Sequence, residues 1–169
     1  MADHKHTIDM ALQEHHNIRE TMEIKGGSVS DFEALFALRQ AYSGWSQCKP
    51  EEVTDRRKQL LETLELVDNG LRIHWDYEEK AMEPIFGEPL MKAFLAEHHD
   101  IGARLKSARQ VIAAEKLEGL APEELLAKKS DIQDIVNRLM QTIEEHSNHE
   151  DMIFKMIKKG LESSEEVKK

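Results

Sequence analysis

The apolar residues of this chain recur with the spacing of an α-helix along most of its length. Four long segments carry an apolar stripe at alternating intervals of three and four residues, the period that places one face of a helix against a core. These segments cover residues 5–24, 51–82, 89–117 and 122–160. A shorter helix is predicted over 31–43, because Ser30 and Glu33 form a capping-box pattern at its start. The sequence has no alternating β-branched runs of the kind that predict strands.

Glycine, proline and small polar residues interrupt the stripes and predict the connections. The breaks lie at KGGS (25–28), SGWSQCKP (43–50), PIFGEP (84–89) and EGLAP (118–122). Asn69-Gly70 is also a turn signal, but the stripe keeps its phase across it, so we predict one helix over 51–82. Short connections between long amphipathic helices predict an all-α, up-down-up-down four-helix bundle, with the short extra helix in the first crossover. We expect one domain over residues 1–160 and a polar, disordered tail over 161–169.

The composition agrees with a helical globular domain and narrows its partners. The 169 residues are 40% hydrophobic and 33% charged, with eight glycines and four prolines. A net charge of −10 without a basic stripe argues against nucleic-acid binding. Cys48 is the only cysteine, which excludes an intramolecular disulfide and a thiolate cluster. The sequence shows neither a signal-peptide core nor an apolar run of membrane-spanning length, so we expect a cytoplasmic protein with no membrane partner.

Two polar patterns occur within the apolar stripes, and each occurs twice. EHHNI at 14–18 recurs as EHHDI at 97–101, and HWDYEE at 74–79 recurs as HSNHED at 146–151. The first pair falls on the first and third long helices, and the second pair falls on the second and fourth. We therefore expect two similar helical hairpins, each of which supplies one lone histidine and one His-x-x-x-acid pair.

The spacing of these residues points their side chains toward one place. Four residues along a helix turn through about 400°, so an imidazole and a carboxylate at i and i+4 project to the same side. Buried carboxylates are very costly unless an opposite charge compensates them. A pair of cations would do so, and imidazole with carboxylate suits iron, manganese or zinc. The predicted metal ligands are His15, His74, Glu78, His98, His146 and Glu150.

The angular position of each residue around its helix decides between neighbouring candidate metal ligands. His15 and His98 continue apolar stripes, whereas His16 and His99 lie among polar residues. Glu150 is one turn beyond His146, whereas Asp151 is rotated about 140° away, so Glu150 is preferred and Asp151 is the alternative. A lone histidine on an apolar stripe is more often a hydrogen-bonded core residue. The common phase of all six candidates favours a shared site instead.

The order of these motifs resembles the hemerythrin-like, or HHE cation-binding, domain family. EHHNIRE, HWDYEE, EHHDIGARL and EHSNHEDMIF are all similar to signatures of that family, and the resemblance extends from about residue 8 to 157. It implies a four-helix bundle around a non-haem di-iron centre. Members of the family bind oxygen, sense oxygen or redox state, handle iron, or repair nitrosatively damaged iron–sulfur clusters.

Two positions depart from the oxygen-carrying hemerythrins. Those proteins have His-x-x-x-His on the third helix, whereas Phe94 stands four residues before His98 here. Their last motif is His-x-x-x-x-Asp, which His146 and Asp151 also match. The missing histidine argues against reversible oxygen carriage.

The resemblance and the residues together lead to one expected function. We expect a non-haem di-iron protein with two bridged iron ions, manganese or zinc being alternatives, that binds or senses oxygen, nitric oxide or peroxide, or handles iron. One alternative is a di-iron enzyme that reduces peroxide, oxidises iron or repairs iron–sulfur clusters. Another is a zinc-binding or metal-free structural bundle. The expected partner is a diatomic or peroxide ligand, and a homodimer is left open. A binding protein is preferred to an enzyme, because no proton donor near the metals can be named.

Overall fold

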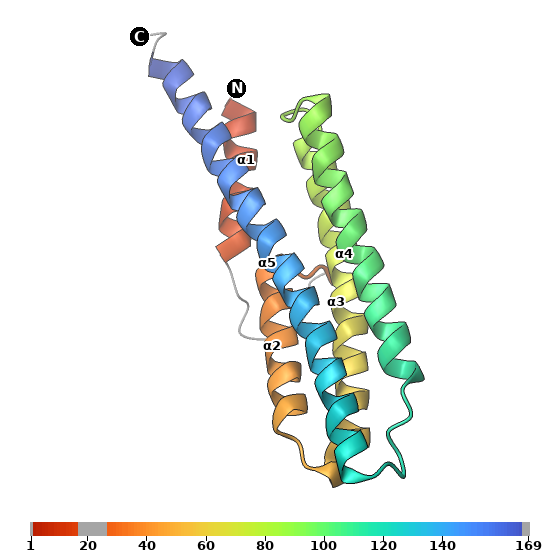
Figure 1. Cartoon of the computed structure of the whole chain (residues 1–169). Helices are drawn as coiled ribbons and strands as arrows, with labels where there is room; N and C mark the ends of the chain where they lie inside the picture. The colour runs from red at the N-terminus through yellow and green to blue at the C-terminus, as the bar shows by residue number, and fades with distance from the viewer. Residues whose placement is uncertain (1, 17–26, 167–169) are drawn as a thin grey trace.

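The computed structural model describes residues 2–16 and 27–166, with side chains described for 3–13 and 27–164. This part of the chain contains five α-helices, the short 3-10 helix η2 and no strand, so the all-α prediction is confirmed. The helices are α1 Ala2–His16, α2 Asp31–Gln47, η2 Pro50–Glu52, α3 Val53–Met82, α4 Glu88–Ala114 and α5 Pro122–Glu166 (Figure 1). No helix in these ranges is long and apolar enough to cross a membrane.

The first two helices lie one after the other along α5. α1 runs beside the C-terminal half of α5 and α2 beside its N-terminal half (Figure 1). α2 also packs against α3, α3 packs against α4, and α4 packs against α5. The predicted first helix over 5–24 is confirmed over residues 5–16, although α1 begins earlier, at Ala2. The rest of that prediction, 17–24, lies outside the described residues. α5 extends past residue 160 to Glu166, so the described part of the predicted tail is helical.

The predicted loop over 43–50 is wrong at its start, because α2 continues to Gln47. Trp45 is fully buried, and its indole Nε1 donates a hydrogen bond to the Lys129 carbonyl at 3.1 Å. In return, Lys129 Nζ donates to the carbonyls of Ser46 and Cys48. Packing against α5 therefore carries the helix through Ser43 and Gly44, which on their own favour a turn.

The start of α2 is held in place by two local features. Its capping box is confirmed, because Ser30 Oγ accepts from the Glu33 N–H and Glu33 Oε2 accepts from the Ser30 N–H. α3 is one helix through Gly70, also as predicted. The Val29 N–H donates to the Gly70 carbonyl at 3.0 Å, and a Cβ on Gly70 would lie 2.2 Å from Val29 Cγ2. Glycine therefore lets the entry to α2 approach the backbone of α3.

Replacing Gly70 with alanine should reduce the free energy of unfolding by about 1–3 kcal/mol, because the added methyl group overpacks the contact with Val29. Urea denaturation of both proteins measures this change. The matched control is Gly160→Ala in α5, where a Cβ meets no neighbour. That change should be neutral or stabilise by up to about 1 kcal/mol. Equal effects in the two variants would contradict the proposed close approach.

The core consists of two apolar clusters with a polar layer between them. The larger cluster joins α2, α3, α4 and α5, and includes Leu71 and Ile143. The smaller cluster contains Ile8, Met82, Phe86, Phe94 and Phe154. Along α3, α4 and α5, the buried histidines and glutamates fall between members of these two clusters. The fold therefore places titratable groups in the interior, where water is largely excluded.

Candidate metal centre

Helices α3, α4 and α5 bring five of the six predicted ligands into this polar layer. α3 supplies His74 and Glu78, α4 supplies His98, and α5 supplies His146 and Glu150; none is more than 5% exposed. Such residues are rarely buried without a charged partner or a metal. The sixth candidate, His15, belongs to the last turn of α1, but its side chain lies outside the described part of the structure.

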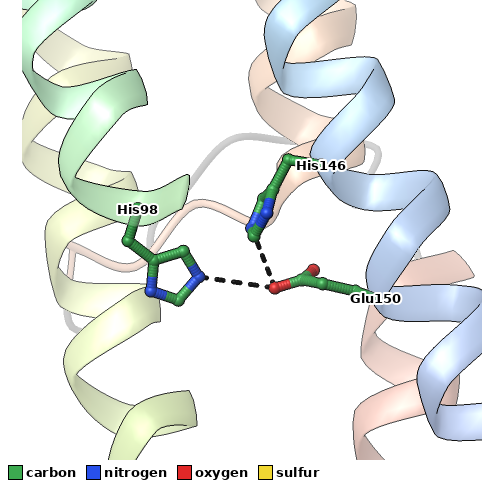
Figure 2. Close-up of side chains that lie close together, drawn as sticks. All are labelled: His98, His146 and Glu150. Atoms are coloured by element: carbon green, nitrogen blue, oxygen red, sulfur yellow. Dashed lines mark hydrogen bonds and ion pairs between the residues drawn. The ribbon is translucent and has the colours of Figure 1, made fainter. Parts of the chain in front are cut away.

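Glu150 lies between two imidazoles from different helices. Its Oε1 is 2.9 Å from His146 Nε2 and 3.4 Å from His98 Nε2. Figure 2 shows both rings pointing toward this carboxylate. The ligand atoms of His98, His146 and Glu150 all lie within 4.8 Å of one another, close enough to share an ion.

Glu78 makes a similar but longer connection to the same ring nitrogen of His98. Its Oε2 is 3.5 Å from His74 Nε2 and 4.0 Å from His98 Nε2. The donor groups therefore form one continuous series: His74, Glu78, His98, Glu150 and His146. Each of these two carboxylates thus lies within 4.0 Å of two imidazole nitrogens.

The Nδ1 atoms of two imidazoles, which face away from the centre, contact further carboxylates. His98 Nδ1 lies 2.7 Å from Glu79 Oε1, and His146 Nδ1 lies 2.7 Å from Glu97 Oε2. Donation from Nδ1–H to these oxygens turns each Nε2 toward the centre, an arrangement typical of metal-ligating histidines. Sequence reasoning missed Glu79 and Glu97. The available signal was their position next to predicted ligands in the pairs Glu78-Glu79 and Glu97-His98.

Asp31 is a third buried carboxylate that sequence reasoning also missed. It is 1% exposed, and its Oδ2 lies 3.7 Å from His146 Nε2. Asp31 is the first residue of α2, where an acid is ordinarily explained by the partial positive charge of the helix N-terminus. The structure adds it to the candidate donors.

The alternative candidates lie outside this set of contacts. Asp151 accepts a hydrogen bond from Lys155 at 2.6 Å, and His99 is exposed on α4. Glu150 and His98 are therefore the members of each pair that the fold directs inward. The His16 side chain lies beyond the described part of α1.

Aromatic side chains surround the histidine at the middle of the series. The Trp75 ring stacks on His98 with a centroid distance of 4.8 Å and an interplanar angle of 12°. Phe94 lies 4.4 Å from His98 and 6.0 Å from His146, centroid to centroid. These rings exclude water and strengthen the electrostatic interactions among the donors.

The carboxylates control the protonation of His146. Burial lowers its pKa, but the contact with Glu150, the charges of Glu150 and Asp31, and the hydrogen bond to Glu97 together raise the pKa to about 10. A proton therefore compensates the carboxylates at neutral pH in the metal-free protein. A cation bound to His146 would replace this proton, so metal binding should be coupled to proton release.

The donor set has the ligand types of a transition-metal site. It combines three described imidazoles with three carboxylates, and these ligand types suit iron, manganese and zinc. The positive charge of a bound cation would offset part of the cost of burying these acids.

Comparison with known proteins adds no family to this description. No family model matches the chain, and no curated protein or solved structure matches it either. The resemblance to the hemerythrin-like family therefore rests on the four sequence motifs and stays a prediction.

Proposed function

We propose that this chain is a non-haem di-iron protein of hemerythrin-like type that binds or senses a small oxidant. The contact of Glu150 with both His98 and His146 carries this proposal, because it places one carboxylate between two potential metal ligands. In the proposed arrangement the long helices form an up-down-up-down bundle, and α1 and α2 together occupy its first position.

The roles of the residues follow from their positions. His74 with Glu78 would hold one ion, and His146 with Glu150 would hold the other, while His98 lies between these pairs. His15 is kept as a proposed ligand and Asp31 is added. When bound, an iron pair would supply electrons and open coordination positions for oxygen, nitric oxide or peroxide. Manganese or zinc are the alternative ions.

Optical spectroscopy of the purified protein tests the iron assignment. Near-ultraviolet bands of an oxo-bridged ferric pair should be present, disappear on adding dithionite and return in air. A colourless protein that contains only zinc would contradict the proposed oxidant chemistry and favour the structural alternative.

The Glu79→Gln and Glu97→Gln variants should each weaken metal binding by about 10- to 100-fold, because each loses the carboxylate that orients a ligand imidazole. Competition against a coloured chelator measures the affinity. Glu62→Gln is the matched control, since Glu62 is exposed on α3 and pairs only with Lys58 among the described residues. Equal metal affinities for the Glu79, Glu97 and Glu62 variants would contradict the proposal that Glu79 and Glu97 orient the histidines.

A further inference from the structure

A pocket of about 170 Å³ lies between α1 and α3 and reaches two of the candidate metal ligands. Four apolar side chains line it, Met10, Ala11, Ala81 and Met82, together with polar ones that include the site donors His74 and Glu78. The pocket therefore connects the outside of the bundle with one end of the polar layer.

The pocket forms because α1 packs against α5 and leaves space between itself and α3. α1 packs mainly against α5, where Ile8 is fully buried beside Phe154 and Lys158 pairs with Asp9. Alanines on both facing helices, Ala11 and Ala81, leave space that larger side chains would fill. The small side chains on α1 and α3 therefore keep this pocket open.

The size and chemistry of the pocket define a class of ligand. An apolar cavity of about 150 Å³ is large enough to bind benzene, so this pocket accepts a body much larger than a diatomic molecule. Methionine and alanine walls suit an apolar body. Glu78 and the net charge of −10 disfavour an anion, whereas a carboxylate and an imidazole can exchange hydrogen bonds with a hydroxyl group.

We propose that this pocket binds a neutral alcohol or phenol of about benzene size, with its hydroxyl end toward His74 and Glu78. The inference deepens the proposed function, on which it rests, because it names an organic ligand that reaches the same centre. The ligand enters beside α3, at the end of the donor series opposite His146.

Methyl NMR of metal-free protein labelled at its methionine methyl groups tests this proposal, with phenol and tert-butyl alcohol as separate probes. Saturable shifts are expected at Met10 and Met82, but not at Met140, which packs in the larger cluster. Binding of either probe supports the proposal, and the tighter one indicates whether the natural ligand is aromatic. Benzoate should bind at least about tenfold more weakly than phenol, because it is charged.

Pocket-filling variants provide the second part of the test. Ala81→Leu should weaken binding of the tighter probe at least about tenfold. Ala127→Leu, on an exposed part of α5, should leave it unchanged. If Ala81→Leu does not fold, Ala11→Leu fills the same pocket from α1. An unchanged probe affinity in a folded pocket-filling variant would overturn the proposal. The absence of NMR shifts at Met10 and Met82 in the unsubstituted protein would also overturn it.

Metal content of the same preparation, measured after adding iron, separates this inference from the function on which it rests. Probe binding without metal uptake would overturn the proposed di-iron function and leave the pocket assignment standing. Metal uptake without probe binding would overturn the pocket assignment alone.

Discussion

Replacing His146 with alanine is expected to remove most of the bound metal and to lower the thermal stability of the metal-loaded protein. His146 Nε2 lies 2.9 Å from Glu150 and 3.7 Å from Asp31, so its loss removes a donor beside two carboxylates. Bound ions stabilise only the folded state. Metal present at about 100 times its dissociation constant adds about 2.7 kcal/mol, and the variant should lose a contribution of this order.

Metal analysis and calorimetry, with and without a chelator, measure both effects. The chelated forms report the loss of packing alone, and the difference between loaded and chelated forms reports the metal. His99→Ala is the control, because His99 is an exposed histidine beside a proposed ligand and should retain metal and stability. Unchanged metal occupancy in the His146 variant would contradict the proposed coordination.

The second large effect concerns pH. The metal-free protein should lose stability as the pH rises from about 6.5 to about 10, because the pKa of His146 is 6.5 ordinarily and about 10 in the folded state. Below pH 6.5 both states bind the proton, and the stabilisation is fully present. Between these values only the folded state keeps the proton, so the free energy of unfolding falls with rising pH, by up to about 1.4 kcal/mol per unit. The total decrease in the free energy of unfolding across this pH range should be about a few kcal/mol.

Urea denaturation at pH 6, 8 and 10, in the presence of a chelator, measures this dependence. The His146→Gln variant lacks the titrating group, so its stability should change much less across the same range. Metal competes with the proton for His146, and the metal affinity of the original protein should therefore rise with pH. Parallel pH profiles for the two proteins would contradict the assigned protonation.

The sequence predicts the helices and the inward side chains because both depend on periodicity within one helix. The phase of the stripes selects His98 over His99 and Glu150 over Asp151, and the structure places these residues accordingly. The continuous helix through Gly70 follows from the same phase.

The missed features depend on contacts between helices, which periodicity does not contain. Glu97 lies on α4, but its partner His146 lies on α5. Asp31 reaches the centre because Gly70 lets the preceding residues approach α3. Trp45 extends α2 beyond a local turn signal because its burial against α5 outweighs the propensity of the neighbouring residues.

Anomalous diffraction from crystals of the iron-loaded protein tests the central claim most directly. Two iron peaks are expected inside the polar layer, within coordinating distance of ligand atoms from His74, Glu78, His98, His146 and Glu150. Iron found only at surface sites, or no anomalous signal among these side chains, would contradict it.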